Sequence, residues 1–376
     1  MWLYRNPVEI IAGEDALNSL ARLVANRRYA VLTYDAPIFG QYLERVAAAV
    51  GYGPVAVVTN IDENPDITGL QCLIDKISGL VERPELLVAL GGGSVIDTCK
   101  VISGCVGQGV PLRNLLASKD AIENPIDYVS IPTTAGTGSE VTCWATVWDP
   151  DNGVKHSLSD PALYGRAALL DPTLTLSLPE SITVSTALDA LSHALESLWN
   201  VNRNPVSSLF AIRAAQLVLV ALPEAIESPS NYQAREALLQ ASLFAGMAFS
   251  NTKTSIAHNI SYAVTLEKGL PHGVACSFTL PMIIRAIEPG TTLAGDIEMI
   301  FDCDYLQAAD RLEDFFRDVG VETNPAAYGY DVFQWTELVA KASSGDRGRN
   351  FNGDIFKLTS LFREDFMQRG DALCQP

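Results

Sequence analysis

Apolar residues come in short runs along the first half of the chain, and each run leads into a turn. Four of these runs favour buried strands: Tyr29–Thr33, Val55–Thr59, Leu86–Leu90 and Tyr128–Pro132. Between them, apolar residues recur at helical spacing over Asp15–Asn26, Tyr42–Val50 and Ile67–Leu80. Strands that alternate with helices predict a parallel sheet whose two faces are covered.

The second half of the chain carries helical patterns, and its strand signals fade. Apolar residues lie three and four positions apart over Ser185–Asn200, Ser207–Glu227, Tyr232–Asn251 and Leu306–Val319. Ser181 and Thr183 are candidate caps for the first of these helices. Two prolines punctuate the segment 171–179, so we predict an α/β domain over residues 1–178 and an all-helical domain over residues 179–376.

Two turns in the first half carry residues that suit a phosphate site. In Glu85–Lys100 (ELLVALGGGSVIDTCK), a predicted strand meets three glycines and a serine before a helix. Glycines let the backbone approach a phosphate, and the free N–H groups of a helix N-terminus attract its charge. The turn matches neither GxGxxG nor a Walker loop, so a plain strand-to-helix turn is the alternative.

The second turn, Ser130–Thr142, holds six hydroxyls and two glycines, a composition that suits hydrogen bonds to phosphate, ribose and amide groups. Its alternative is a polar loop with helix caps. After the first strand, Asp35 is a candidate to bind the ribose hydroxyls of adenosine, where its charge would repel the 2′-phosphate of NADP. The sequence equally allows Asp35 to be a turn residue, with Tyr34 at the key position.

Three of the four histidines form, with one aspartate, a candidate metal site. Asp189 and His193 lie four residues apart on a predicted helix and therefore project from one face. His258 and His272 follow in SIAHNISYAVTLEKGLPHG. Three imidazoles and a carboxylate suit Zn²⁺, Fe²⁺, Co²⁺ or Ni²⁺.

The charge and cysteine content of the chain indicate which kinds of binding partner and which cell compartment to expect. The net charge of −18 argues against a nucleic acid or an anionic membrane, since both favour basic surfaces. The seven cysteines form no CxxC pair, which predicts buried reduced thiols in a cytoplasmic protein. The N-terminus does not read as a signal peptide, and the apolar stretch Ala214–Pro223 is too short to span a bilayer.

Together these motifs resemble the iron-containing (group III) alcohol dehydrogenase family. The resemblance covers nearly the whole chain, from NPVEIIAGEDALNSL through ENPDITG, GGGSVIDTCK and SIPTTAGTGSE to ALDALSHALES and GLPHGVACSFTLP. It implies an N-terminal dinucleotide-binding domain with a parallel sheet, a C-terminal helical domain, and an active site in the cleft between them.

The resemblance also implies the residues of the site. The metal ligands would be Asp189, His193, His258 and His272, with Fe²⁺ as the family's metal and Zn²⁺ or Ni²⁺ as alternatives. The residues that bind NAD or NADP would be Asp35, Asn64, Gly92, Gly93, Ser94, Thr133, Thr134, Thr142, Lys155, Thr173 and Leu174.

One position departs from the family's pattern. Many members carry a second histidine four residues after the third metal ligand, and Tyr262 stands there in this chain. A phenol titrates far above an imidazole, so proton delivery by an imidazole is not expected at this position. Tyr262 and His272 are the candidate catalytic residues, with a ribose hydroxyl or water as alternatives to Tyr262.

The activity implied is hydride transfer between a nicotinamide and a small alcohol or aldehyde bound to the metal, in a homo-oligomer. The alternatives are a lyase that uses NAD transiently, similar to dehydroquinate synthase, and a binding protein that has lost the reaction. The histidine-bearing segments also resemble the branch with phosphonate-associated dehydrogenases, which implies an anionic substrate such as phosphonoacetaldehyde. Arg347 and Arg349 are candidates to bind its charge, or belong to a solvated basic loop.

Overall fold

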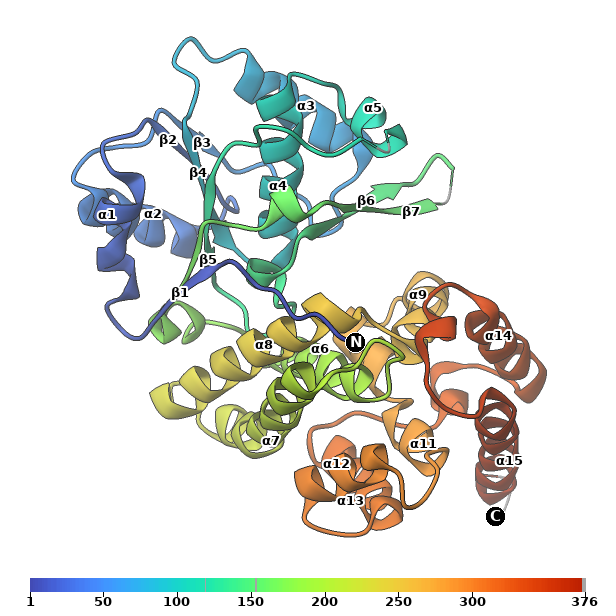
Figure 1. The fold of residues 1–376 in the computed structure, drawn as a ribbon. Helices are drawn as coiled ribbons and strands as arrows, with labels where there is room; N and C mark the ends of the chain where they lie inside the picture. Colours follow the sequence, from blue (N-terminus) through green and yellow to red (C-terminus); the bar gives the residue numbers. More distant parts are fainter. Residues whose placement is uncertain (119, 153, 374–376) are drawn as a thin grey trace. The chain divides into compact units, whose positions relative to one another are not determined.

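The computed structural model describes residues 1–118, 120–152 and 154–373 (Figure 1). The chain forms two compact units. One consists of Asn6–Ser177, and the other of Met1–Arg5 with the chain from Leu178 onwards. The first five residues therefore belong with the helical part of the chain.

The first unit is built on a six-stranded parallel sheet in the order β1-β8-β5-β4-β2-β3. These strands are β1 (Glu9–Ala12), β2 (Tyr29–Leu32), β3 (Ala56–Val58), β4 (Leu86–Gly91), β5 (Tyr128–Pro132) and β8 (Ala167–Leu170). The predicted parallel sheet is confirmed. β1 and β8 were missed, since four-residue strands such as AALL carry no turn signal that separates them from helix.

Helices cover both faces of this sheet, which explains why its strands are continuous apolar runs rather than alternating ones. Tyr29 and Val31 of β2 pack with α1 (Leu20–Val24) and α2 (Pro37–Val50). Ala30 and Leu32, on the opposite face, pack in a second cluster with residues of α3 (Ile67–Ser78), α4 (Gly93–Gln108) and α5 (Leu112–Ala117).

The order of the strands creates a switch point at β2 and β4. The chain passes from β2 outward to β3 and then returns to β4 on the other side of β2. Leu32 pairs with Ala89 and Gly91 with Pro132, so the carboxyl ends of β2, β4 and β5 lie side by side. Ligands of open parallel sheets bind at such a point. A two-stranded hairpin, β6 (Trp144–Asp149) and β7 (Val154–Ser159), follows the second polar turn and was not predicted.

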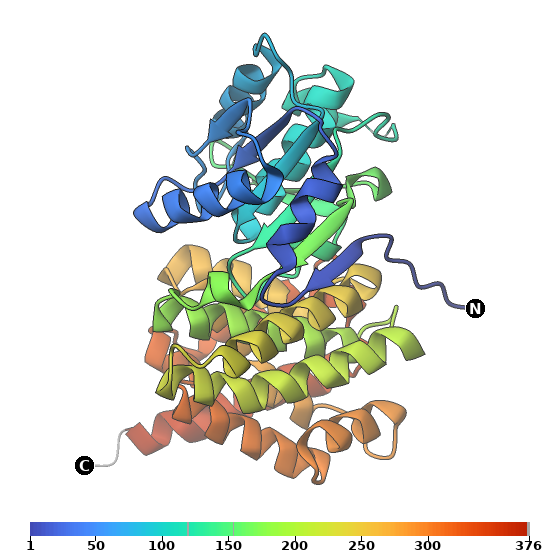
Figure 2. The ribbon, with the colours of Figure 1, turned by 90° about the vertical axis from the view of Figure 1, so that its left-hand side faces the viewer.

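The second unit is helical over the described residues (Figures 1 and 2). Its helices are α6 (Glu180–Leu198), α7 (Pro205–Glu227), α8 (Tyr232–Thr252), α9 (Ile256–Lys268), α10 (His272–Ser277), α11 (Leu280–Arg285), α12 (Thr292–Phe301), α13 (Tyr305–Asp318), α14 (Val332–Ser344) and α15 (Ile355–Leu373). α6 is central: it packs against α7, α8 and α10, and every residue from 187 to 200 is buried.

Two expectations about these helices were wrong. α6 begins at Glu180 after Pro179, so Ser181 and Thr183 lie inside its first turn and cap nothing. The Thr183 hydroxyl instead donates to the Pro179 carbonyl and accepts from Arg235. The length argument for Ala214–Pro223 also fails, because α7 continues past Pro223 to Glu227.

Among the described residues, α7 is the one helix with the length and mean hydropathy (1.7) of a membrane span. It packs against α6 and α8, and its alanines at positions 211, 214 and 215 are fully buried. A core helix passes the same test of length and composition, so this feature is weak evidence for a membrane span.

The cysteines differ in solvent exposure, whereas the sequence predicted that they are buried. Cys99, Cys105, Cys143 and Cys276 are buried and free, but Cys72 is exposed and Cys303 is only partly buried. Cys374 lies outside the described residues.

Candidate metal centre and cofactor turns

The candidate metal centre is assembled from three helices of the second unit. α6 carries Asp189 and His193 one turn apart, α9 carries His258 in its first turn, and α10 begins at His272. α10 lies so close to α6 that a Cβ on Gly273 would come within 1.6 Å of the carbonyl oxygen of Ser185. Only glycine permits this approach, which brings His272 beside α6.

The three imidazoles converge on one carboxylate oxygen. The Nε2 atoms lie 3.4 Å (His258), 3.8 Å (His193) and 3.9 Å (His272) from Oδ1 of Asp189. Nε2 of His258 is buried and has no hydrogen-bond partner among the described residues. Nitrogen and oxygen ligands that face a common point in this way fit a divalent cation such as Fe²⁺ or Zn²⁺.

Glu196 orients His258 from the opposite side of its ring. Nδ1 of His258 lies 2.7 Å from Oε2 of Glu196, and the carboxylate also accepts the backbone N–H groups of Ser255, Ala257 and His258. It thereby satisfies free donors at the start of α9. An Nδ1–H that donates to Glu196 leaves Nε2 as the free ligand atom of the ring.

The charges of the centre are strongly coupled. Burial raises the pKa of Asp189, but the nearby imidazoles outweigh this effect and hold the pKa below its ordinary value. For His258, burial lowers the pKa, and the nearby carboxylates of Glu196 and Asp189 outweigh this effect and raise the pKa. A bound cation would replace the imidazolium charges as the partner of Asp189.

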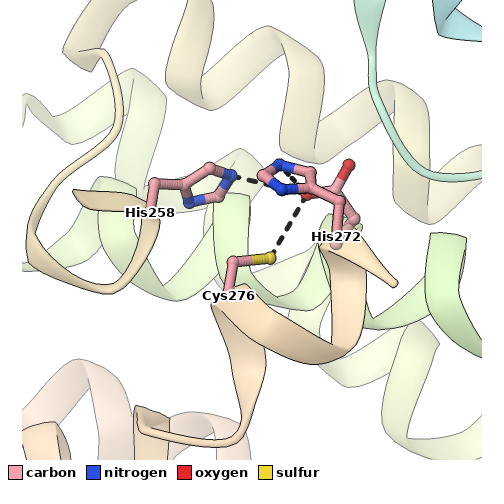
Figure 3. A group of neighbouring side chains, drawn as sticks. His258, His272 and Cys276 are labelled. Carbon is pink, nitrogen blue, oxygen red and sulfur yellow. Dashed lines mark hydrogen bonds and ion pairs between the residues drawn. The ribbon is translucent and has the colours of Figure 1, made fainter. Parts of the chain in front are cut away.

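Cys276 belongs to the same group, although the sequence did not single it out. The ligand atoms of Asp189, His258, His272 and Cys276 all lie within 4.8 Å of one another. Figure 3 shows the Cys276 thiol in one group with His258 and His272. Its Sγ donates to Oδ1 of Asp189 at 3.5 Å. Cys276 follows His272 by four residues, so helical spacing was the signal that could have found it. Burial raises the pKa of the thiol well above its usual range, which keeps it a protonated donor to Asp189.

His193 stands at the side of this group, held by ring contacts. Its imidazole stacks on Phe249, with centroids 3.9 Å apart and planes 5° apart, and on His258 at 4.5 Å. Phe249 therefore fixes one face of the ring that the sequence proposed as a ligand.

The two predicted turns of the first unit pack against each other at the switch point. A Cβ on Gly92 would meet the Thr134 hydroxyl at 3.1 Å, and one on Gly93 would meet the Thr137 side chain at 2.7 Å. Asp35 follows β2 and is exposed at the same edge of the sheet. Backbone N–H groups, hydroxyls and a carboxylate thus gather where an open parallel sheet binds its ligand.

A model of the iron-containing alcohol dehydrogenase family matches residues 7–172 of this chain. A model of the C-terminal part of the Fe-containing alcohol dehydrogenase family matches residues 183–354. The chain belongs to the iron-containing alcohol dehydrogenase family. The two matches meet near the boundary between the two units.

Several relatives in this family have assigned activities. The chain is 35% identical to 1-propanol dehydrogenase of Citrobacter freundii over 61% of its own length and 59% of that protein. It is 37% identical to the NAD-dependent methanol dehydrogenase of Bacillus methanolicus over 54% of its own length and 53% of that protein. The matched segments thus span little more than half of these relatives.

A solved structure matches over a greater length. Sulfoacetaldehyde reductase from Bifidobacterium kashiwanohense, in complex with NAD⁺, superposes with a TM-score of 0.90 at 27% identity. The match covers 97% of this chain and 99% of that one. This likeness supports the two-part fold of a parallel-sheet unit and a helical unit.

The structure places the other predicted cofactor residues in the first unit of this family member. Gly92, Gly93, Ser94, Thr133 and Thr134 lie at or next to the ends of β4 and β5. Asn64 lies on an exposed loop before α3, and Lys155 stands over the Trp148 ring in the hairpin. Thr173 donates to Asp171, and Leu174 lies in the core beneath it. Their part in cofactor binding stays a prediction.

Thr142 stands in a different environment from the other residues of its turn. It is buried, and its hydroxyl accepts a hydrogen bond from the buried Lys100 at 2.9 Å. Lys100 also donates to Ser139 at 2.7 Å and to the Trp144 carbonyl at 2.8 Å. The lysine therefore ties the polar turn to α4, a role that the sequence did not reveal.

Proposed function

We propose that this protein is a metal-dependent, NAD(P)-linked alcohol dehydrogenase or aldehyde reductase that acts on a small alcohol or aldehyde. The observation that carries the proposal is the convergence of three imidazole Nε2 atoms on Oδ1 of Asp189. Membership of the iron-containing family favours Fe²⁺, while Zn²⁺ and Ni²⁺ suit the same ligand types. The relatives named above are dehydrogenases and a reductase, which favours this reaction over that of a synthase or a binding protein.

In this proposal, Asp189, His193, His258 and His272 hold the metal. When bound, the metal supplies a Lewis acid for the substrate oxygen, and the nicotinamide supplies or accepts the hydride. Glu196 fixes the His258 ring with Nε2 toward the centre, and the Cys276 thiol donates to Asp189. The Tyr262 ring lies parallel to His272, with centroids 6.4 Å apart, which makes its hydroxyl a candidate to pass a proton.

NAD is the favoured cofactor within the proposal. Asp35 is exposed after β2, beside the switch point, where a carboxylate would repel the 2′-phosphate of NADP. The solved relative holds NAD⁺, and the methanol dehydrogenase is named as NAD-dependent. We further propose that the protein binds neither nucleic acid nor membrane, because its net charge is −18. A cytoplasmic location is proposed because its seven cysteines form no CxxC pair, and a homo-oligomer because the chain resembles its family.

The direct test is His272→Ala, compared with wild-type protein reconstituted separately with Fe²⁺ and Zn²⁺ and assayed with NADH and NADPH. Loss of one of four ligands should lower both bound metal and turnover by roughly 100-fold or more, since even the loss of an outer partner costs roughly 10–100-fold. His156→Ala is the control, because His156 lies on the β6–β7 hairpin, beside Asp149. Unchanged metal content and turnover in His272→Ala would contradict the proposal.

A further inference from the structure

Arg347 and Arg349 follow α14, and the structure places their side chains in different environments. Arg349 is exposed and forms an ion pair with Asp346. Arg347 is partly buried, and its Cζ lies 4.9 Å from the centre of the Tyr262 ring. Among the described residues, no carboxylate lies within ion-pair distance of Arg347. The two side chains are therefore not equivalent members of a solvated basic loop.

Glu196 is the carboxylate whose charge acts on Arg347, but its oxygens already accept hydrogen bonds from other groups. Burial lowers the pKa of Arg347, and the charge of Glu196 offsets this only in part. Both oxygens of Glu196 accept hydrogen bonds from the start of α9 and from His258. A partly buried guanidinium without a bonded anion is costly, and its five N–H donors match the geometry of an acid group.

Hydrogen bonds tie the end of α14 and the loop that carries Arg347 to α9 and to the residue segment before it. Nδ2 of Asn259, next to His258, donates to the Ala342 carbonyl at 2.5 Å. On the other side of Arg347, Nδ2 of Asn350 donates to the Thr254 carbonyl at 2.9 Å, before α9. A Cβ on Gly348 would come within 2.3 Å of the Ala342 carbonyl oxygen, so the loop is tightly packed.

The Tyr262 ring links Arg347 to the candidate centre, because it contacts both Arg347 and His272. Tyr262 contacts Arg347, and its ring is parallel to that of His272 within 3°. The Arg347 guanidinium thus contacts a ring that itself stacks on the candidate ligand His272. An acid group a few bonds from the carbonyl would supply the anion that Arg347 lacks.

We propose that Arg347 binds the acid group of an anionic aldehyde, that is, a carboxylate, sulfonate or phosphonate a few bonds from the carbonyl. The inference rests on the proposed aldehyde reductase activity. In the reaction, one NADH gives a hydride to the carbonyl carbon and one proton is added to its oxygen. The products are the primary alcohol and NAD⁺, and the acid group is unchanged.

The test compares aldehydes matched in chain length on the full-length, Fe²⁺-loaded protein with NADH. Acetaldehyde is paired with sulfoacetaldehyde and with phosphonoacetaldehyde, and butanal is paired with 4-oxobutanoate. The readout is the ratio of kcat/KM for the anionic aldehyde to that for its neutral partner. Partial unfolding or metal loss lowers both values equally and leaves this ratio unchanged.

We expect wild-type protein to prefer at least one anionic aldehyde. Arg347→Ala should lower that preference roughly 10–100-fold, mainly through KM, which is the effect of losing a charge-assisted pair. Arg347→Lys should restore part of this preference, because lysine keeps the positive charge but lacks the two parallel N–H donors of a guanidinium. Arg349→Ala is the matched control and should leave the preference unchanged. If Arg347→Ala does not fold, Arg347→Gln and Arg347→Lys provide the same comparison.

Three results would overturn the inference: a wild-type preference for the neutral aldehydes, an unchanged ratio in Arg347→Ala, or an equal fall in Arg349→Ala. Reduction of neutral aldehydes alone would leave the proposed function standing and reject only the role of Arg347. Failure to reduce any of these aldehydes would reject the proposed function, and the inference with it.

Discussion

At the scale of single residues, the candidate centre depends on partners that the ligand pattern does not contain. Glu196 lies three residues after His193, yet it acts on His258, which is 62 positions later in the chain. Its side chain is fully buried, and its oxygens accept four N–H groups. The ring of His258 is thus aimed by a residue that sequence spacing assigned no role.

Glu196→Gln should disrupt this arrangement. The amide presents an NH₂ to donors, so at least one buried N–H loses its acceptor and the His258 ring is free to turn. We expect roughly 10–100-fold weaker metal binding and a destabilisation of about 2 kcal/mol. Metal titration and chemical unfolding measure the two effects. Glu180→Gln, at the exposed start of α6, is the control. Equal metal affinity and equal stability of the two variants would contradict the role of Glu196 in orienting His258.

At the scale of elements, hydrophobic spacing predicted the long helices and the central strands well. Tyr29–Thr33 and Leu86–Leu90 match β2 and β4 closely, because a strand buried on both faces must be apolar throughout. The failures occurred where local signals are weak or ambiguous. The caps assigned to α6 were wrong because the helix begins at Glu180, directly after Pro179, so Ser181 and Thr183 lie inside it. α10 is a six-residue helix with too short a pattern to be recognised.

The contact between α6 and α10 predicts a large effect of Gly273→Ala. The added Cβ would meet backbone atoms, the Ser185 oxygen and the Asp189 nitrogen, which cannot move without shifting α6. We expect a loss of about 3 kcal/mol in the free energy of unfolding, together with reduced metal binding. Gly295→Ala, on the exposed side of α12 with no atom within 4 Å, should instead gain up to about 1 kcal/mol. Equal stability of the two variants would show that α10 can move away from α6.

At the scale of the whole molecule, acidity and burial together shape the dependence of stability on pH. The chain carries a net charge of −18, and most of its carboxylates are exposed to water. Glu140 is an exception, since it is 2% exposed, and its Oε1 has no hydrogen-bond partner among the described residues. Burial raises its pKa to about 6, although its own backbone N–H and Lys100 act in the opposite direction.

A carboxyl group whose pKa is raised on folding favours the folded state at low pH. That contribution is complete below the ordinary value of 4.5 and is lost as the pH rises through about 6. Glu140→Gln cannot ionise, so its stability relative to wild type should rise by about 2 kcal/mol across this window. Urea unfolding at several pH values measures the difference, with the exposed Glu82→Gln as the control. A difference between wild type and Glu140→Gln that does not vary with pH would exclude ionisation of a buried Glu140.

The sequence by itself determined what short-range physics can encode. Hydrophobic spacing distinguished a sheet-forming half from a helical half, glycines marked the turns, and the four-residue spacing of Asp189 and His193 placed them on one helical face. These features depend on neighbours within about one helical turn or one strand. His258 and His272 were candidate ligands from the sequence as well, but no local spacing places them relative to that face.

Only the tertiary structure decided which distant residues meet. The approach of α10 to α6 brings His272 and Cys276 to Asp189, and Glu196 turns His258 toward them. The same packing leaves Arg347 without an anion while Arg349 pairs with Asp346, although the two differ by only two positions in the chain. Such contacts are set by how whole helices pack and which polar groups remain unpaired, and no local pattern of residues contains that information.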